Sequence, residues 1–193
     1  TDYHDLFTMG LDGAVIATPP PTHHTIARDC LQHGLHILVE KPLTLNSQHA
    51  EDLLALAADK NLIVMAGHTF EYNGAVHALK DIITSGELGD IFYISTLRLN
   101  LGLFQRDLNV LWDLAPHDIS MLRFLLDSEP LNVGASGASY IVKDVYDIAF
   151  LCLEFPNNVR AHVRVSWLDP CKVRQETVVG SEKMAVFDDV ATS

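Results

Sequence analysis

Three apolar runs in the first third of the chain have the pattern of strands in a parallel sheet. They are residues 14–18 (AVIAT), 36–40 (HILVE) and 62–67 (LIVMAG). Short continuous apolar runs bounded by turn residues are typical of strands that are buried on both faces of such a sheet. Helical segments at residues 22–34 and 47–60 separate them. This order of strands and helices predicts right-handed crossovers and a doubly wound α/β sheet.

Residues that start and stop helices lie at the ends of these two helical segments. We expect Thr22 to be the N-cap of the first helix and Gly34 to follow its last turn as the C′ residue. Asn46 or Ser47 is expected to cap the second helix, whose body is rich in alanine and leucine.

The pattern changes after Gly67. A helix (75–85), a strand (91–99) and an apolar helix (112–126) precede a strand-rich part that begins at Asn132. Residues 159–167 alternate strictly, which places Val159, Ala161, Val163, Val165 and Trp167 on one face and Arg160, His162, Arg164 and Ser166 on the other. This pattern predicts an α+β domain with a mostly antiparallel open sheet that has one wet face. We therefore expect two domains, residues 1–70 and residues 71–193.

The composition is that of a folded, acidic protein. Of the 193 residues, 48% are hydrophobic and 20% are charged, which excludes a disordered chain. The net charge of -12 argues against a nucleic-acid binder, and no apolar run is long enough for a membrane span. A signal peptide is not expected, because no basic segment followed by an apolar stretch opens the chain. Three cysteines, an odd number without a CxxC pair, favour a reducing, cytoplasmic compartment.

One element of a dinucleotide-binding domain is missing. Such a domain opens with a strand, a G-x-G-x-x-G loop and a helix, whereas none of the 11 glycines here forms G-x-G. The sequence also stops soon after VFDD, without a closing helix. We therefore expect an internal piece of a longer protein, cut at both ends.

Candidate chemistry follows the first two expected strands. Glu40-Lys41-Pro42 comes at the carboxyl end of the second strand, where open α/β sheets bind their ligands. Thr18-Pro19, with His23 nearby, occupies the equivalent end of the first strand. The structural alternatives are a surface lysine before a turn and a strand terminator followed by a capped helix.

A second candidate is the pair Asp113 and His117. Four residues apart on a helix, they would be neighbours on one face, close enough for the carboxylate to hold an imidazole nitrogen. Pro116 either kinks this helix or lies in its first turn. In the second case a helix N-terminus just before Pro116 would favour the neutral imidazole. The alternative is a helix-capping Asp and a histidine that is satisfied structurally.

Taken together, these motifs resemble the Gfo/Idh/MocA family, the glucose–fructose oxidoreductase and inositol dehydrogenase group of NAD(P)-dependent sugar enzymes. The matching blocks occur in family order and cover nearly the whole chain: DGAVIATPPPTHH, HILVEKPLTLN, LIVMAGHTFEYN, ITSGELGDI, WDLAPHDISMLRFLL and VVGSEKMAVFDD. The resemblance implies the C-terminal half of a Rossmann doubly wound parallel sheet, followed by an α+β substrate-binding and dimerisation domain. NAD or NADP would be the cofactor.

The resemblance also implies site residues. The catalytic group carries over to Lys41, Asp113 and His117. The implied cofactor contacts are Thr18, Pro19, His23, Glu40, Lys41 and Pro42. We expect His117 to accept the substrate proton, Asp113 to orient it and Lys41 to stabilise the substrate oxygen, because free imidazole has a pKa of about 6.5, near working pH. An exchange of roles, with Lys41 as the base, stays open.

Substrate contacts are expected from two places. Tyr72 and Asn73 follow the third strand, where structural turn residues are an equally good account. Arg98, Asn100 and Arg106 precede the Asp113 helix and could bind an anionic substrate such as a nucleotide sugar; a solvated loop with ordinary charges is the alternative.

The expected function is hydride transfer between nicotinamide and a CH–OH group of a sugar, polyol or nucleotide sugar. Within the family, the sequence most resembles members that act on UDP-N-acetylhexosamine-type sugars at C3. The alternatives are a non-catalytic family member or dimerisation module and a metal hydrolase that uses Asp113 and His117. Metal binding through the histidines at 23, 24, 33 and 36 and Cys30 is not expected, because no standard zinc spacing occurs. We expect a small-molecule substrate, no nucleic-acid or membrane partner, and a homodimer or homotetramer formed through the outer face of the second sheet.

Overall fold

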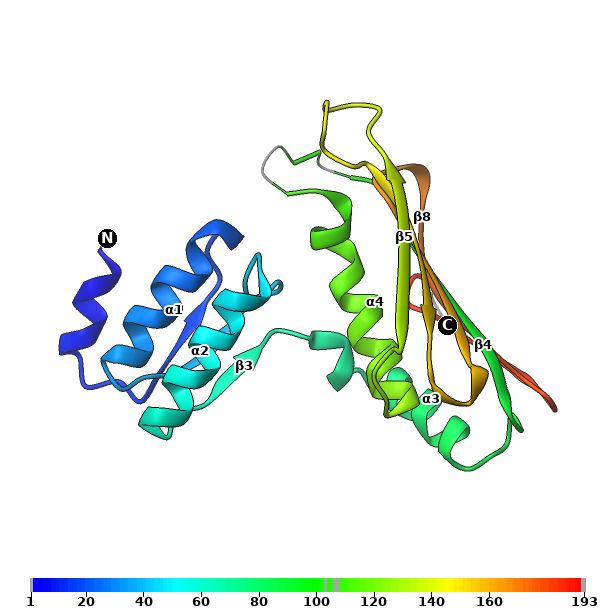
Figure 1. Cartoon of the computed structure of the whole chain (residues 1–193), viewed down its shortest axis with the longest axis horizontal. Coiled ribbons are helices and arrows are strands. Elements are labelled where there is room, and N and C mark those ends of the chain that lie inside the picture. The colour runs from blue at the N-terminus through cyan, green and yellow to red at the C-terminus, as the bar shows by residue number, and fades with distance from the viewer. Residues whose placement is uncertain (1, 103, 106–107, 192–193) are drawn as a thin grey trace. The chain divides into compact units, whose positions relative to one another are not determined.

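The computed structural model describes residues 2–102, 104–105 and 108–191. The chain divides into two compact units, Thr1–His68 and Thr69–Ser193 (Figure 1). Arg106 lies outside the described residues.

The first unit is a parallel sheet with the strand order β1-β2-β3, connected through two helices. Its elements are η1 (Tyr3–Thr8), β1 (Gly13–Ile16), η2 (Pro20–Thr22), α1 (His23–Gln32), β2 (His36–Val39), α2 (Ser47–Lys60) and β3 (Val64–Ala66). Each strand lies next to the strand that follows it in the sequence, which is the order expected when successive right-handed crossovers run in the same direction. The predicted strand–helix alternation is therefore confirmed, and the sheet is Rossmann-like.

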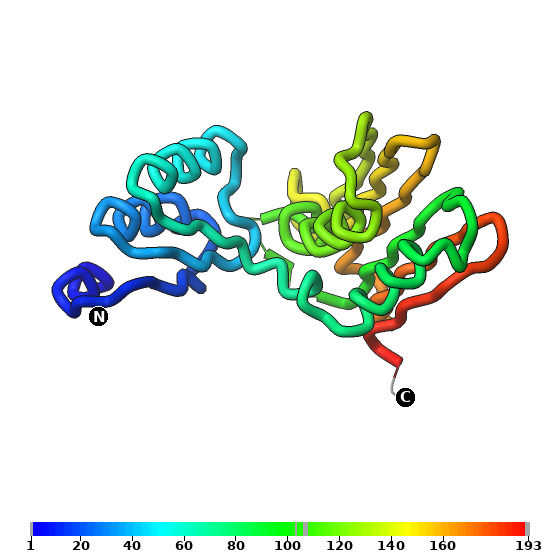
Figure 2. Tube along the Cα trace, turned by 90° about the horizontal axis from the view of Figure 1, so that it is seen from below, coloured from blue at the N-terminus to red at the C-terminus, as the bar shows by residue number. Residues whose placement is uncertain are grey.

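Helices α1 and α2 pack side by side and against the sheet (Figure 2). Leu31 of α1 and Leu53 of α2 are fully buried, together with Val39 of β2. These residues belong to one apolar cluster, which is the core of the first unit. The core fixes where β1 and β2 end, and so where the turns that follow them lie.

The other face of this sheet is open in the part of the chain that the structure describes. Val15, Leu38 and Met65 are aligned across the three strands, and Val15 is 72% exposed while Met65 is 37% exposed. The prediction that the first apolar run is buried on both faces was wrong. The physical reason is that both crossovers run in the same direction, so that both helices cover the same face.

The caps of these helices differ in one respect from the prediction. Asn46 is the N-cap of α2, and its side chain accepts a hydrogen bond from the His49 N–H at 2.8 Å. Thr22 precedes α1 but makes no side-chain cap, because a 3-10 turn leads directly into the helix and its hydroxyl donates to the Pro19 carbonyl instead. Gly34 follows α1 with a φ of 82°, in the left-handed conformation expected there.

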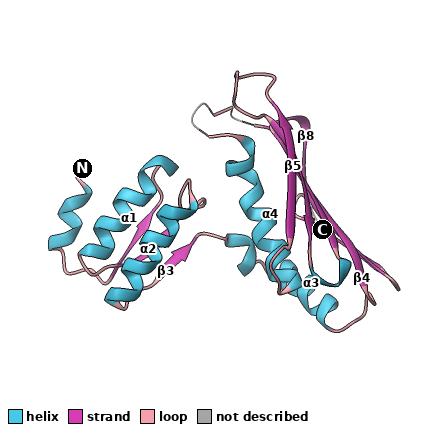
Figure 3. Ribbon diagram, in the orientation of Figure 1, coloured by secondary structure: helices cyan, strands magenta, loops and turns pink. Residues whose placement is uncertain are grey.

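The second unit is a six-stranded open sheet with helices on one face, in the order β5-β6-β7-β4-β8-β9 (Figure 3). Its elements are η3 (Thr69–Tyr72), α3 (Gly74–Thr84), β4 (Ile91–Leu101), α4 (Val110–Leu126), β5 (Asn132–Ala138), β6 (Ile148–Glu154), η4 (Pro156–Asn158), β7 (Arg160–Ser166), β8 (Leu168–Gly180) and β9 (Met184–Asp188). β4 and β7 are parallel, whereas the other pairs are antiparallel, so the predicted mostly antiparallel sheet is confirmed.

Helix α4 covers the inner face of this sheet, and β7 shows how that face is built. All five apolar residues predicted on one face of residues 159–167 are buried, and Trp167 is only 1% exposed. The prediction for Ser166 was wrong, because it is fully buried and its hydroxyl accepts a hydrogen bond from the Leu168 N–H at 3.0 Å. At this position the chain turns into β8, and the strict alternation ends.

Helix α4 begins earlier than predicted. Asn109 is its N-cap and accepts a hydrogen bond from the Trp112 N–H at 3.2 Å, so the first helical residue is Val110. Pro116 therefore lies in the helix interior and not in its first turn. The expectation that a helix N-terminus just before Pro116 acts on His117 was wrong, because the dipole effect fades beyond the first turn.

Candidate active site

Two turns of the first unit, one after β1 and one after β2, carry the predicted cofactor contacts. Ile16 pairs with Val39 in the parallel register, so the residues that follow both strands leave the same edge of the sheet. Thr18 and Glu40 are exposed at this edge. Ligands of open parallel sheets bind at the carboxyl ends of the strands, and the fold thus brings these predicted residues to a suitable place.

His23 connects the two turns. Its ring is fully buried, and its two nitrogens lie 2.8 Å from the carbonyl oxygens of Thr18 and Pro42. Both nitrogens are therefore engaged with backbone groups. His23 is thus a fully buried residue, and its effect on a bound cofactor would act through the turns that it joins.

The turn after β2 presents the side chains of Glu40 and Lys41. The Lys41–Pro42 peptide bond is cis, Pro42 is buried, and Lys41 is half-buried. The Lys41 N–H donates to the Glu40 carboxylate at 3.3 Å. On the neighbouring turn, the Thr18 and Thr22 hydroxyls are 2.7 Å apart.

The end of β3 packs closely against this turn. The Gly67 N–H donates to the Val39 carbonyl at 2.7 Å, and a Cβ at Gly67 would approach the Glu40 Cα to 3.3 Å. A larger residue would push the Glu40 turn outward. The exposed hydroxyl of Thr18, the exposed carboxylate of Glu40 and the half-buried Lys41 are thus held on a backbone frame, and this set of donors and acceptors fits a polar cofactor group such as nicotinamide with its ribose.

In the second unit, α4 carries both other catalytic candidates. Asp113 and His117 are one turn apart on one face of the helix, and both are half-buried. The indole N–H of Trp167 donates to the Asp113 Oδ2 at 3.0 Å. Since Trp167 is almost fully buried, it fixes the carboxylate against the start of β8. The alternating pattern of residues 159–167 predicts a core position for Trp167 and gives no sign of this second contact.

The His117 imidazole packs against Phe70 of η3. The ring centroids are 5.3 Å apart, and the planes meet at 74°, which is an edge-to-face contact. The backbone at His117 is also held, because the Ser120 hydroxyl donates to its carbonyl at 2.9 Å. An aromatic side chain thus limits the orientations of the ring.

A buried charge cluster lies next to His117, and two of its members, Asp118 and Glu176, were not predicted from the sequence. Arg98, Asp118 and Glu176 are 4%, 2% and 0% exposed. The Arg98 Nε and Nη2 donate to the two carboxylate oxygens of Asp118 at 2.9 and 3.2 Å. Arg98 therefore lies inside the second unit with its guanidinium engaged by a carboxylate, and not on a solvated loop.

Burial controls the protonation of both acids in the cluster. It raises the pKa of Asp118, although the Arg98 guanidinium acts in the opposite direction. It also raises the pKa of Glu176 to about 8, with a smaller contribution from the Asp118 charge. Neither carboxyl oxygen of Glu176 has a hydrogen-bond partner among the described residues. With a pKa of about 8, Glu176 is neutral at pH 7, beside the Arg98–Asp118 ion pair.

The remaining substrate candidates have different surroundings. Tyr72 is 70% exposed at the end of η3. The side chain of Asn73 caps α3 by accepting hydrogen bonds from Ala75 and Val76, as the structural alternative proposed. Asn100 is half-buried near the end of β4. The structure brings none of these residues into the Arg98 ion pair.

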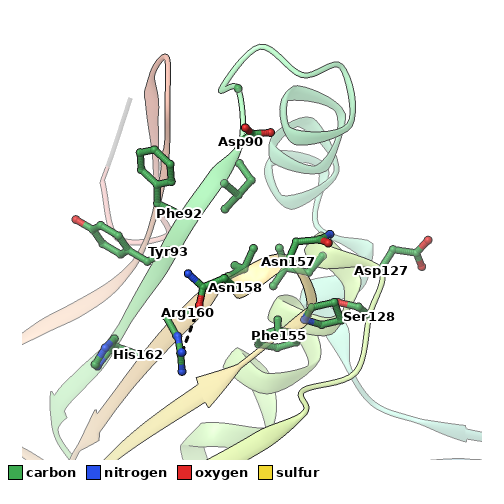
Figure 4. Close-up of a pocket in the computed structure, with 15 residues that line it drawn as sticks. Asp90, Phe92, Tyr93, Asp127, Ser128, Phe155, Asn157, Asn158, Arg160 and His162 are labelled. Atoms are coloured by element: carbon green, nitrogen blue, oxygen red, sulfur yellow. Dashed lines mark hydrogen bonds between the residues drawn. The ribbon is translucent and has the colours of Figure 1, made fainter.

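The second unit also has a groove that the sequence did not indicate, with a volume of about 1220 Å³. Figure 4 shows the side chains that line it. The groove lies where β4 begins, α4 ends and η4 turns into β7, and neither Asp113 nor His117 is among the described residues that line it. The labelled side chains around it are Asp90, Phe92, Tyr93, Asp127, Ser128, Phe155, Asn157, Asn158, Arg160 and His162.

In the described part of the chain, no group of three or more His, Cys, Asp or Glu side chains is arranged to hold a metal ion. No described helix combines the length and the apolar character that crossing a membrane requires.

Comparison with known proteins agrees with this architecture. Residues 1–68 match the model of an oxidoreductase family with an NAD-binding Rossmann fold, and residues 76–186 match the GFO/IDH/MocA C-terminal domain. Two consecutive domains of one oxidoreductase family thus cover most of the sequence. The chain belongs to the GFO/IDH/MocA family of oxidoreductases, and its first unit has the NAD-binding Rossmann fold.

Individual relatives have related activities. The UDP-N-acetylglucosamine 3-dehydrogenase of Acidithiobacillus ferrooxidans is 28% identical over 95% of this chain and 58% of that protein. The scyllo-inositol 2-dehydrogenase (NAD(+)) of Bacillus subtilis is 26% identical over 93% of this chain and 56% of that protein. The crystal structure of GenD2 from gentamicin A biosynthesis, in complex with NAD, superimposes with a TM-score of 0.89 at 25% identity, over 97% of this chain and 58% of that one. The chain thus spans a little over half the length of these relatives.

Proposed function

We propose that the whole protein is an NAD(P)-dependent dehydrogenase that oxidises a CH–OH group of a sugar, polyol or nucleotide sugar to a carbonyl. The observation that carries this proposal is the pair Asp113 and His117, which lie one turn apart on α4. Within the same unit, the Trp167 indole binds the Asp113 carboxylate and the Phe70 ring packs against the His117 imidazole. The NAD-binding fold of the first unit and the activities of the relatives support it.

The proposed role of the first unit is to hold the nicotinamide side of the cofactor. We assign the contacts to Thr18, Pro19, Glu40 and Lys41 at the carboxyl ends of β1 and β2, with His23 and Pro42 holding the two turns together. Bound nicotinamide would supply the hydride acceptor at C4, and the protein would supply orientation and proton transfer.

The proposed role of His117 is to accept the hydroxyl proton of the substrate. Loss of hydride from a carbinol carbon leaves a carbonyl only if this proton also leaves, so a base has to be within hydrogen-bond reach. Asp113, fixed by the Trp167 indole, would stabilise and orient the imidazolium that results. The Lys41 ammonium would stabilise negative charge on the substrate oxygen as the O–H bond breaks.

The proposed substrate contacts are assigned from their positions in the second unit. Tyr72 is exposed on η3, in the same unit as His117, and its phenol can donate to or accept from a sugar hydroxyl. Asn73, Asn100 and Arg106 stay predictions. The likeness to a UDP-N-acetylglucosamine 3-dehydrogenase supports a nucleotide sugar as the first substrate to try.

The proposed assembly is a homodimer, or a homotetramer built from it, joined through the outer face of the second sheet. Tyr93, Phe150 and Met184 are 43%, 45% and 59% exposed on that face, which has no covering helix in the described part of the chain. Arg160 pairs with Glu154 on the same face, so its charge already has a partner within the chain. The three free cysteines support a reducing, cytoplasmic location.

The function is tested by an absorbance assay at 340 nm on the whole protein. NAD⁺ and NADP⁺ are each combined with UDP-N-acetylglucosamine, myo-inositol, scyllo-inositol and glucose. The proposal expects reduced nicotinamide to form with at least one of these pairs. A folded protein that binds the cofactor but is inactive with a broad panel of sugars, polyols and nucleotide sugars would favour the alternative, a non-catalytic member or dimerisation module.

A further inference from the structure

The interior of the second unit contains a buried ion pair, Arg98–Asp118, where apolar side chains are normally found. Both side chains are at least 95% buried, where each charge loses its hydration. Replacing such a pair with apolar residues of similar size is often neutral or stabilising in proteins. Stability alone therefore does not account for this pair, and a geometric role has to be considered.

The pair is connected to His117 through the helix backbone. Asp118 is the next residue of α4 after His117, and its carboxylate is held by two parallel N–H···O bonds from one planar guanidinium. Since neighbouring residues on a helix point about 100° apart, a fixed Asp118 limits the rotation of α4 about its axis, and so the direction in which His117 points.

A second connection runs through Phe70. The Arg98 Cζ lies 4.6 Å from the centroid of the Phe70 ring, which is a cation–π contact. The same ring meets the His117 imidazole edge-to-face. One guanidinium thus contacts both the residue that follows His117 and the ring that packs against it.

We propose that Arg98 is a positioning residue that sets the orientation of the His117 imidazole through Asp118 and Phe70. The proposal rests on the proposed function in that it takes His117 as the proton acceptor. Arginine suits this position, because its planar fork binds a carboxylate with two bonds while its face stacks on an aromatic ring, and lysine cannot do both. Arg98 would thus act on the reaction without touching the substrate.

The direct test replaces the ion pair with an apolar pair in the whole protein, as the double variant Arg98→Met/Asp118→Leu. The substitution removes both charges of the buried pair, and the raised pKa of Glu176, about 8, keeps that acid neutral at pH 7. Arg174, whose charge also acts on Asp118, keeps its ion pair with Asp189. We expect an unfolding midpoint in urea that is unchanged or higher, a kcat that is roughly 10- to 100-fold lower and KM values within about threefold of the wild type.

The matched control is the exposed ion pair at the end of the same helix, as Arg123→Met/Glu129→Leu. It removes the same charges and should leave kcat unchanged. A kcat of Arg98→Met/Asp118→Leu equal to that of the control would overturn the proposal.

A readout that does not depend on activity is the NMR signal of the His117 ring in the 193-residue chain, assigned with His117→Ala. We expect the chemical shifts of its Cε1–H and Cδ2–H to change in Arg98→Met/Asp118→Leu and to stay constant in Arg123→Met/Glu129→Leu. If the double variant does not fold, Phe70→Leu decides, because it removes the aromatic connection and leaves the ion pair intact. Unchanged His117 signals and kcat in Phe70→Leu would then refute the proposal.

Measurements of kcat in His117→Ala separate this proposal from the proposed function. If His117→Ala keeps the wild-type kcat, His117 is not the base and the proposed mechanism fails, whereas the NMR signals still decide whether Arg98 orients the ring. If His117→Ala is impaired, adding Arg98→Met/Asp118→Leu to it should reduce kcat no further. A further loss of kcat in that background would contradict a role that acts through His117.

Discussion

Single residues in this chain show how burial gives polar groups their roles. Trp167 is a core residue by its pattern and a hydrogen-bond donor to Asp113 by its position. Asp118 and Glu176 could not be assigned to the interior from sequence, because acidic residues in otherwise amphipathic segments are normally expected on the surface. The catalytic candidates were predictable because they lie in motifs. The residues that hold them in place, such as Trp167 and Arg98, are distant from them in the sequence.

Glu176 should make stability depend on pH. Its pKa is about 8 in the folded chain and near 4.5 when exposed, so between these values the folded state holds a proton that the unfolded state has released. The free energy of unfolding should therefore fall as pH rises from about 4.5 to about 8. Glu176→Gln lacks this titration, so its free energy of unfolding minus that of the wild type should increase by up to about 1.4 kcal/mol per pH unit over this range.

Urea unfolding followed by tryptophan fluorescence measures this effect, because both tryptophans, Trp112 and Trp167, lie in the second unit. The exposed Glu182→Gln serves as the control and should parallel the wild type. A constant difference between Glu176→Gln and wild type across this pH range would show that Glu176 is already ionised in the folded chain.

His23 should be important for the stability of the first unit. His23→Ala leaves the carbonyls of Thr18 and Pro42 without their ring partner and opens a cavity, which should cost roughly 2–4 kcal/mol. Hydrogen exchange followed by mass spectrometry should show faster exchange of α1 and β2 amides. His49→Ala, at an exposed position of α2, is the control. Equal protection in the two variants would be inconsistent with the bridging role.

Helices and strands followed the sequence pattern more closely than their ends did. The order of elements and the buried face of β7 were predicted, because apolar periodicity reports which side of an element meets the core. The start of α4 was not, because the prediction began the helix at its apolar body and overlooked Asn109 as the cap. The open face of the first sheet was also missed, since a continuous apolar run does not say which helices cover it.

The N-cap of α4 should contribute measurably to the stability of the second unit. Asn109→Ala removes the acceptor for the Trp112 N–H and should cost about 1 kcal/mol, whereas Asn109→Asp keeps an acceptor and should cost much less. The fluorescence-detected urea unfolding described above measures both. An alanine variant as stable as the wild type would mean that water satisfies this N–H equally well.

At the scale of the whole molecule, the chain carries two family domains, and the proposed catalytic residues come from both. The sequence blocks predicted the family because they occur in order. The choice of substrate could not be predicted, because it depends on the shape and polarity of a site that no single motif describes.

Assembly through the outer sheet face is tested by sedimentation of the whole protein at tens of micromolar concentration. Phe150→Asp places a charge on the proposed interface and should convert the assembly to smaller species. Leu54→Asp, at a site on α2 that is 53% exposed, should leave it unchanged. A wild-type protein that sediments as a monomer would contradict the proposed dimer.

The measurement that tests the account most directly is the turnover of His117→Ala and Lys41→Met with the best substrate and cofactor. We expect each substitution to lower kcat by roughly a hundredfold or more while the cofactor affinity changes little, and Asp113→Asn to cost less than His117→Ala. The opposite result, near-normal turnover in His117→Ala together with an inactive Lys41→Met, would make Lys41 the base and contradict the assignment of proton transfer to α4.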